Sequence, residues 1–422
     1  MSSSDIEKLY QLAEEKYFQA GIDTKRALNL LHGISLSIHC WQGDDIAGFE
    51  RTQSNLGDGG IQVTGNYPGK ARNLDELRKD LKKVYSLIPG NHRLNLHAIY
   101  GDFAGKYVDR DSITPEHFAS WIEWAEQENL KLDFNATCFS HPKAAAGYTL
   151  SSRDKAIRTF WIEHVKRCRQ ISAFIGQKLK DTVVHNIWIP DGSKDMPADR
   201  WQPRKLLKMS LDEIFSQEYP AAQMKDALES KLFGIGSESY VVGSHEFYMG
   251  YGLSKGKMLC LDMGHFHPTE SIADKISAIL QFSNELLLHI SRGVRWDSDH
   301  VVVLNDDLLN LALEIVRGDV LQRVHFGLDF FDASINRIGA WVIGSRATLK
   351  AFLYALLYPH EKLQALEQEG RLFERLALME EMKSMPAGVI WDYYCIKNDV
   401  APGSDYIQEI QNYEKMELAK RR

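Results

Sequence analysis

Two stretches of this chain decide how it folds: residues 258–265 read MLCLDMGH, and residues 285–292 read ELLLHISR. Each is a short apolar run that carries an acidic or imidazole side chain toward its end. Six further apolar runs carry a His, Asp, Glu, Asn or Lys, most of them toward the end: ISLSIHCW (34–41), RLNLHAIY (93–100), KLDFNATCF (131–139), TVVHNIWIP (182–190), LESKLFGI (228–235) and RVHFGLDFF (323–331). Strands that are apolar along their length and polar at the carboxyl end are typical of a parallel (β/α)8 TIM barrel, an α/β fold whose site lies at the strand ends.

Segments with helical periodicity lie between the runs and begin at recognisable capping residues. Asn73 opens NLDELRKDLKKVYSLI, and Thr114, followed by Pro115 and Glu116, opens TPEHFASWIEWAEQENL. Further helices are predicted over 152–179, 270–284, 306–317 and 334–357. Strand and helix alternating in this way predict parallel pairing with right-handed crossovers. An open doubly wound sheet is the alternative, but polar ends on all eight runs favour closure, because an open sheet concentrates its chemistry at one switch point.

The length of 422 residues exceeds the roughly 250 of a minimal barrel, so additions are expected. We predict an N-terminal helical segment (1–33), the catalytic barrel (34–358) and a C-terminal helical extension (359–422). Apolar residues recur at helical spacing in the extension, which predicts packing on the barrel or on a neighbouring subunit: Leu363, Leu366, Phe373, Leu376 and Met379. The connections 42–72 and 191–209 are long and rich in Gly, Asp and Pro, so we expect walls over the site; surface decoration is the alternative.

Composition restricts the class of protein. A net charge of -7 argues against nucleic acid as a partner, and no apolar run is long enough for a membrane span. The first residues, MSSSDIEKLYQLAEEKYFQ, have no apolar core of the kind that a secretory signal needs. The five cysteines are scattered and mostly lie in apolar runs, which indicates reduced core residues in a cytoplasmic protein: Cys40, Cys138, Cys168, Cys260 and Cys395.

Metal-ligand residue types gather on the last four runs and the loop between two of them. They are Glu229 with Lys231 two positions on, Asp262 followed by His265 and His267, His289, Asp297 with Asp299 in the following loop, and Asp329. Hard divalent cations take carboxylate oxygens with one or two imidazoles in roughly octahedral geometry. Because one ion cannot use so many ligands, the pattern predicts two neighbouring metal ions that share at least one carboxylate and clamp two substrate oxygens.

Each of these residues also has a simpler structural interpretation. A lone buried histidine is more often a hydrogen-bonded core residue than a ligand. Asp297 and Asp299 could cap the next helix, and Lys231 could be a salt-bridge partner of Glu229. Lys231 could also suggest a Schiff-base aldolase, but beside metal ligands an ammonium that neutralises developing oxyanion charge is favoured. Taken together, the simple interpretations would have to hold independently at many matching positions.

Two glycine-containing segments do not support nucleotide binding. GNYPGKAR (65–72) fails the spacing of a phosphate loop and follows no strand directly. FGIGSES (233–239) has a bare GxG and lacks the third glycine of a dinucleotide site.

Several longer motifs resemble the bacterial L-rhamnose isomerase family from about residue 6 to 420. They are HCWQGDD (39–45), TGNYPGKAR (64–72), LNLHAIY (94–100), FSHP (139–142), NIWIPDG (186–192), ESKLFGIGSESY (229–240), LDMGHFHPTE (261–270), RWDSDHVV (295–302) and GLDFFDASINRI (327–338). The resemblance implies a barrel similar to that of xylose isomerase, a homotetramer, and two divalent ions per subunit, typically Mn²⁺, with Co²⁺ or Mg²⁺ as alternatives. It implies an intramolecular oxidoreductase that interconverts L-rhamnose and L-rhamnulose.

The resemblance also implies roles for individual residues. Glu229, Asp262, His289 and Asp329 would hold a structural metal, and His265, Asp297 and Asp299 a catalytic one, with Asp262 nearby or bridging. Of the two histidines in GHFHP, the resemblance selects His265. Lys231 and His97 would touch the sugar, and Trp188 would form part of its wall.

The expected reaction moves one hydrogen between carbon 2 and carbon 1 as a hydride, with a metal-bound water or hydroxide steered by Asp329 handling the oxygen proton. A general base acting through a cis-enediol is the competing route. His97 is the candidate that assists ring opening, and Trp41, Trp188, Ile61 and Ile99 are candidates for an apolar wall around the 6-methyl group. A two-metal aldolase or hydrolase and a non-catalytic sugar-binding protein are the other classes considered.

Overall fold

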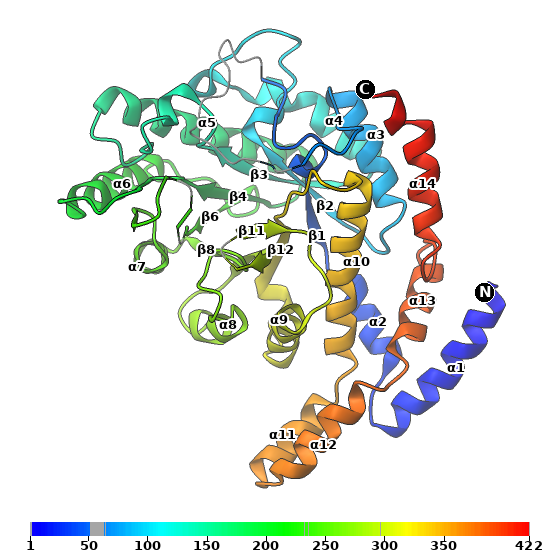
Figure 1. The fold of residues 1–422 in the computed structure, drawn as a ribbon. Helices are drawn as coiled ribbons and strands as arrows, with labels where there is room; N and C mark the ends of the chain where they lie inside the picture. Colours follow the sequence, from blue (N-terminus) through cyan, green and yellow to red (C-terminus); the bar gives the residue numbers. More distant parts are fainter. Residues whose placement is uncertain are drawn as a thin grey trace.

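The structure is a computed structural model of the 422-residue chain and describes residues 2–50, 63, 65–231, 233–234, 236–295 and 297–421, without the side chains of 297–299. Its centre is a closed barrel of parallel strands in the order β1-β12-β9-β8-β6-β4-β3-β2 (Figure 1). The strands are β1 (Leu36–His39), β2 (Arg93–His97), β3 (Lys131–Thr137), β4 (Val183–Trp188), β6 (Met224–Glu229), β8 (Met258–Asp262), β9 (Leu286–Ile290) and β12 (Val324–Leu328). The predicted TIM barrel is confirmed, and the open doubly wound sheet is excluded.

Helices surround the barrel and extend beyond it on one side (Figure 1). The helices up to the one that follows the last barrel strand are α1 (Ser3–Gln19), α2 (Thr24–His32), α3 (Leu74–Tyr85), α4 (Ala119–Gln127), α5 (Lys155–Leu179), α6 (Trp201–Ile214), α7 (His245–Lys255), α8 (Ala273–Ile279), α9 (Asp306–Arg317) and α10 (Arg337–Leu356). Four more follow: α11 (His360–Gln368), α12 (Leu372–Met382), α13 (Ala387–Lys397) and α14 (Tyr406–Met416). The two ends of the chain meet where Tyr10 of α1 stacks on Tyr393 of α13 with ring centroids 3.8 Å apart.

The fifth strand was placed wrongly from the sequence. The apolar pattern predicted it at 228–235, whereas β6 ends at Glu229, so Lys231 lies in the connection that follows and not on the strand. The first half of β6 escaped detection because it contains charged residues that are paired in the fold. Lys225 lies 2.6 Å from Glu285, and Asp226 lies 2.9 Å from the buried Arg169.

The helix signals were correct where capping chemistry supported them. Asn73 accepts a hydrogen bond from the backbone of Glu76 at the start of α3, as predicted. Thr114 and Pro115 open a 3-10 turn (Pro115–Phe118) before α4 begins, and α8 is shorter than the predicted 270–284. Helices α6 and α7 were not predicted, and α6 takes up the end of the proposed 191–209 wall. The 42–72 wall lies partly outside the described residues.

Two small antiparallel pairs lie outside the barrel sheet. One joins β5 (Gly192–Ser193) to β7 (Tyr240–Val241), and the other joins β10 (Arg292–Val294) to β11 (Asp297–His300). Both follow carboxyl ends of barrel strands, β4 and β9 respectively. They therefore build up the rim on the side where the site residues end.

The barrel interior is unusually polar for this fold, whose centre is usually filled by branched apolar residues. Asn95, Asp133, Asn135 and Asn186 are all buried there. The barrel strands also carry a small apolar cluster of Val184, Ala227, Met258, Cys260 and Leu287. Asn186, Glu229, Asp262 and His289 each stand two positions after a member of this cluster on the same strand. Because side chains two apart on a strand share a face, the residues that follow them point into the upper barrel.

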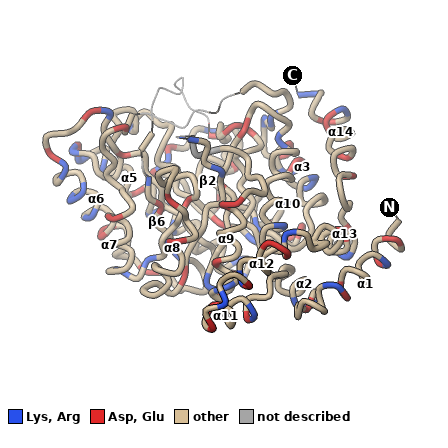
Figure 2. The backbone as a smooth tube through the Cα atoms, turned by 60° about the horizontal axis from the view of Figure 1, so that its bottom comes forward, with Lys and Arg blue, Asp and Glu red and all other residues tan. Residues whose placement is uncertain are grey.

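Lysine, arginine and acidic residues are interspersed along the outer helices that Figure 2 labels. In the part of the chain that the structure describes, no helix is both long and apolar enough to cross a membrane.

Candidate metal centre

Four residues from four strands meet at the carboxyl end of the barrel, and we call them the carboxylate cluster. Glu229 and Asp262 are the last residues of β6 and β8, His289 lies near the end of β9, and Asp329 directly follows β12. One ligand atom from each lies within 4.8 Å of the others. Strand register explains the convergence, because Asp262 pairs with His289 across β8 and β9, and His289 pairs with Gly327 across β9 and β12. The structure thus brings together residues 100 positions apart in the sequence.

The glycine at 327 leaves room for the His289 ring. A Cβ atom at this position would lie 3.1 Å from Cδ2 of His289. A side chain at 327 would therefore require the His289 ring to shift by a few tenths of an ångström, which gives this strand glycine a packing reason.

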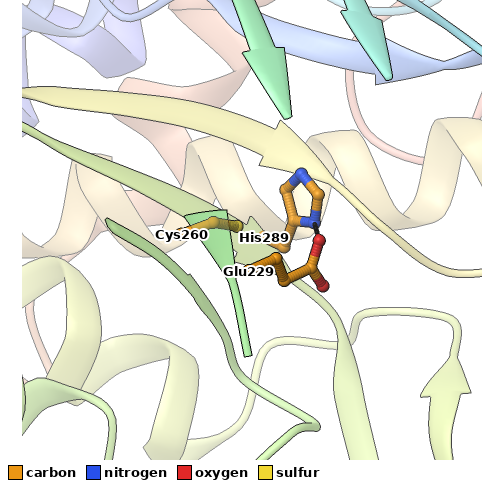
Figure 3. Close-up of side chains that lie close together, drawn as sticks. All are labelled: Glu229, Cys260 and His289. Carbon is orange, nitrogen blue, oxygen red and sulfur yellow. Dashed lines mark ion pairs between the residues drawn. The ribbon is translucent and has the colours of Figure 1, made fainter. Parts of the chain in front are cut away.

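The cluster is buried and carries more negative than positive charge. Nδ1 of His289 lies 3.2 Å from Oε2 of Glu229, 3.1 Å from Oδ2 of Asp329 and 4.0 Å from Oδ2 of Asp262. Figure 3 shows the His289 ring and the Glu229 carboxylate facing each other. No lysine or arginine among the described residues forms an ion pair with these three carboxylates, so the charge calls for a cation from outside the chain.

The pKa shifts follow from this crowding. Burial, with the nearby Asp329 and Glu229 carboxylates, raises the pKa of Asp262 to about 7. Burial lowers the pKa of the His289 ring, but the neighbouring Cys260, Glu229 and Asp329 outweigh it and raise the pKa well above the usual value. Neither ring nitrogen of His289 makes a hydrogen bond to a described residue. Carboxylate oxygens with a poised imidazole are the donor set of a hard or borderline divalent cation, so these residues fit a metal.

Each carboxylate of the cluster is held by a neutral group. Trp41 donates from Nε1 to Oδ1 of Asp329 (3.1 Å), Asn186 donates from Nδ2 to Oε2 of Glu229 (2.5 Å), and Ser291 Oγ (2.7 Å) and the Gly264 amide (2.6 Å) donate to Oδ1 of Asp262. Sequence reasoning missed all of these bonds. Trp41 was considered only as a wall residue, and neutral polar residues within strands carry no signal until the register is known.

Of the two histidines in GHFHP, the structure brings His265 to the cluster. Its Nδ1 lies 3.1 Å from Oε1 of Glu229 and 3.0 Å from the carbonyl oxygen of Ser230. His267 is exposed, and its Nδ1 contacts Oγ1 of Thr269 at 2.7 Å. His265 therefore belongs to the site, whereas His267 lies on the surface beside Thr269.

Asp297 and Asp299 belong to β11, but their side chains lie outside the described part of the structure. The β10–β11 hairpin itself can be placed, because a Cβ atom at Gly293 would lie 3.7 Å from Cα of Gly264. The hairpin that carries these aspartates thus packs beside the loop that carries His265.

A second group of possible ligands overlaps the first: Glu229, Cys260 and His289 (Figure 3). Cys260 pairs with Glu229 across β6 and β8 and lies two residues before Asp262. Burial raises the pKa of its thiol above the usual value. A soft sulfur ligand suits zinc or copper, whereas the oxygen-rich group suits manganese, cobalt or magnesium.

Rings from the other half of the barrel face the cluster, and we call Trp41, His97, Phe139 and Trp188 the aromatic arc. Successive ring centroids lie 4.7, 5.5 and 5.7 Å apart, each pair nearly edge to face. His97 Nδ1 lies 3.1 Å from Oγ1 of Thr137, and burial lowers the pKa of His97 to about 3, so its ring is neutral. Phe139 was not predicted. Of the other wall candidates, Ile99 is buried and Ile61 lies outside the described residues.

Lys231 lies at the edge of the arc. Its Nζ is 5.6 Å from the Trp188 ring centroid, and it forms no ion pair with Glu229, so the salt-bridge alternative is not supported. Burial lowers the pKa of Lys231 to about 8, opposed by the charge of Asp191. At neutral pH the ammonium is retained in a largely desolvated position.

Proteins of known family resemble this chain in sequence over almost its whole length. The sequence model of the L-rhamnose isomerase (RhaA) family matches residues 4–421. Curated proteins named L-rhamnose isomerase from Rhodopirellula baltica, Bacteroides thetaiotaomicron and an Enterobacter species are 57%, 56% and 55% identical. The alignments cover 99% of this chain and 98%, 99% and 100% of those proteins. Among solved structures, an L-ribulose 3-epimerase aligns over 81% of this chain and 98% of that one at 12% identity, with a TM-score of 0.45.

Proposed function

The chain belongs to the L-rhamnose isomerase family, and from that premise we propose that it interconverts L-rhamnose and L-rhamnulose by an intramolecular hydride shift assisted by two divalent metal ions. The observation that carries the proposal is the carboxylate cluster. Three carboxylates and one imidazole converge at the barrel end, and no lysine or arginine among the described residues forms an ion pair with the carboxylates. Membership of the family supports L-rhamnose as the substrate, and the carboxylate cluster supports metal-assisted chemistry.

We assign the cluster residues Glu229, Asp262, His289 and Asp329 to one metal ion. The second ion is assigned to His265, Asp297 and Asp299, with Asp262 nearby or bridging. Support comes from the contact between His265 and Glu229 and from the position of the β10–β11 hairpin beside Gly264. Mn²⁺ is the proposed ion, two per subunit, with Co²⁺ or Mg²⁺ able to replace it, because all three accept oxygen and imidazole ligands.

The sugar is proposed to lie between the cluster and the aromatic arc. Trp188 offers an apolar surface, and the ammonium of Lys231 beside it can donate hydrogen bonds to sugar oxygens. His97 is neutral at physiological pH and its Nδ1 is occupied by Thr137, so it acts through hydrogen bonding and not as a charged acid during ring opening.

When bound, the two ions supply Lewis acidity that polarises both reacting oxygens and lowers the barrier for hydrogen to move between carbons 2 and 1 as a hydride. Asp329 is suited to guide the accompanying oxygen proton through a water molecule. Of the three cluster carboxylates, Asp329 has the most exposed side chain, at 20%. Trp41 donates a hydrogen bond to Oδ1 of Asp329 and so restrains the carboxylate. This route requires no general base that removes a proton from carbon.

Isotope exchange separates the hydride shift from the enediol route. The reaction is run in heavy water from ketose to aldose, and deuterium is measured at the carbon that received the hydrogen. A hydride shift predicts almost none, whereas substantial incorporation would support a general base and a cis-enediol.

A chelator experiment tests the function itself. Rhamnulose formation is followed spectroscopically before chelation, after chelation and after Mn²⁺ is returned. Loss and recovery of turnover support a metal-dependent isomerase. Turnover that persists in full after the metal has been removed would contradict the proposal, and binding without turnover would favour a sugar-binding protein.

We further propose a cytoplasmic homotetramer, in which the C-terminal extension contributes to subunit contacts. All five cysteines are buried and unpaired, which suits a reducing compartment. Helix α12 exposes large apolar side chains, including Phe373 at 82% and Leu376 at 56%. Light scattering of the wild-type protein and of Phe373→Glu tests this: a tetramer that dissociates in the variant is expected, and a wild-type monomer would contradict it.

A further inference from the structure

Asn186 is a buried amide on a strand that carries none of the assigned metal ligands. It lies on β4 between Val184 and Trp188, which share its face, and only 3% of it is exposed. Its Nδ2 donates a hydrogen bond of 2.5 Å to Oε2 of Glu229. The amide thus reaches from β4 to the last residue of the neighbouring strand β6, which belongs to the carboxylate cluster.

The other end of the amide does not explain why an asparagine stands here. Its Oδ1 is buried and has no hydrogen-bond partner among the described residues. Asn186 also lines a cavity of about 300 Å³ in the amino-terminal half of the barrel, together with Ser37, Asn95 and Asp133. Among the described residues, Glu229 is therefore the hydrogen-bond partner that accounts for an amide at this position.

Glu229 needs such a restraint because both of its oxygens face imidazoles. Oε1 lies 3.1 Å from His265 and Oε2 lies 3.2 Å from His289. A hydrogen bond to Oε2 fixes the rotation of the carboxylate and keeps Oε1 toward His265. An amide does this without adding a fourth negative charge to the cluster, which an aspartate at 186 would do.

We propose that Asn186 is a positioning residue that orients the Glu229 carboxylate for metal binding. The inference rests on the proposed metal site and goes beyond it by naming a residue that acts through a ligand. Partners of this kind typically change metal affinity by about 10- to 100-fold when they are removed.

Asn135 provides a matched control on the neighbouring strand β3. It is also a buried amide, 2% exposed, and it pairs with Asn186 in the β3–β4 register. Its Nδ2 donates to Oδ1 of Asn95 at 2.6 Å and to the carbonyl oxygen of Leu96 at 3.1 Å, and not to a cluster residue. Loss of Asn135 should therefore disturb the barrel interior without disturbing Glu229.

The test measures Mn²⁺ binding directly, by electron paramagnetic resonance titration of chelator-stripped protein without sugar. Asn186→Leu is expected to weaken binding of the tighter ion by about 10-fold or more, while Asn135→Leu stays within about twofold of wild type. Thermal unfolding in chelator checks that both variants fold. If Asn186→Leu does not fold, Asn186→Ala and Asn135→Ala replace the pair, with the same expectation.

Either of two results would overturn the inference: Mn²⁺ affinity of the folded Asn186 variant within twofold of wild type, or an equal loss in the Asn135 variant. Wild-type protein that binds no Mn²⁺ would instead overturn the proposed metal site. The failures of the two proposals are therefore distinguishable. A positioning role also predicts that excess Mn²⁺ restores most of kcat in Asn186→Leu.

Discussion

The two halves of the barrel mouth are built from opposite chemistry. Strands β6, β8, β9 and β12 lead into carboxylates that repel one another and into the imidazole of His289, which the carboxylates attract. Strands β1 to β4 lead into the rings of the aromatic arc, where His97 is neutral. A cation needs oxygen donors, whereas the carbon face of a deoxy sugar needs apolar contact. The contrast teaches that the proposed metal ligands and the proposed sugar wall come from different strands, and that Trp41 and Asn186 link the two halves through hydrogen bonds to Asp329 and Glu229. Variants of residues that make no such bond should therefore separate metal binding from sugar selection.

The largest effect is expected in the charged half. Asp262→Ala removes a carboxylate from the cluster and should lower kcat/KM by on the order of a thousandfold or more, since metal polarisation supplies several kcal/mol of transition-state stabilisation. Steady-state kinetics with Mn²⁺ titration checks this. Asp274→Ala removes an exposed aspartate on α8 and serves as the control. Near wild-type activity of Asp262→Ala would remove this residue from the metal site.

A carboxyl behind the aromatic half should make folding pH-dependent. Asp44 is buried, accepts hydrogen bonds from Tyr100 (2.6 Å) and the Gly48 amide (2.7 Å), and burial raises its pKa to about 7. Because the folded pKa exceeds the unfolded value of about 3.9, the folded state binds the proton more tightly. Its contribution to stability is complete below about pH 4 and is lost as pH rises through about 7.

Asp44→Asn should remove this pH dependence, which amounts to at most about 4 kcal/mol. Denaturant unfolding of the metal-loaded protein between pH 4 and 8 measures it. The wild-type free energy of unfolding should fall relative to that of the variant as pH rises. Parallel profiles for the two proteins would show that Asp44 titrates normally.

A smaller effect, confined to sugar binding, is expected in the aromatic half. Phe139→Leu and Trp188→Leu should raise KM for L-rhamnose by about tenfold, within the 1–3 kcal/mol that apolar pocket contacts supply. Mn²⁺ affinity should not change in Phe139→Leu, because the ring contacts of Phe139 are with His97 and Trp188 and not with an assigned metal ligand. A smaller change in Mn²⁺ affinity is expected in Trp188→Leu, because Trp188 stacks on His265 with ring centroids 6.4 Å apart. A loss of metal affinity in Phe139→Leu would erase the distinction between the halves.

The smallest effect is expected at Cys260, which distinguishes the two overlapping groups of possible ligands. Cys260→Ser should leave Mn²⁺ affinity and kcat within about twofold, since the oxygen-rich group suits this ion and the buried thiol stays protonated. Competition between Mn²⁺ and Zn²⁺, followed by metal analysis, provides the measurement. A large loss of metal would assign a ligand role to the thiol.

The sequence was most informative where a metal-ligand residue stands at the end of an apolar run, because the run predicts the strand and the residue type predicts the chemistry. Asp262 and His289 could be predicted because each stands near the end of a clear apolar run. Asn186 and Ser291 could not, because a neutral residue becomes a partner of a ligand only through strand register. The start of β6 was missed because the partners of Lys225 and Asp226 lie on other elements. Phe139 could not be predicted as a site residue, because in the sequence it is one more apolar residue after β3. Its contacts with His97 and Trp188 form only in the folded barrel.

Anomalous scattering at the manganese edge, from crystals grown with Mn²⁺ and soaked in L-rhamnose, tests the central claim most directly. Two peaks are predicted, one among Glu229, Asp262, His289 and Asp329 and the other on the side of His265, with sugar oxygens facing both and the carbon chain against the aromatic arc. Peaks away from these four residues, or an ordered sugar with no metal beside it, would contradict the account.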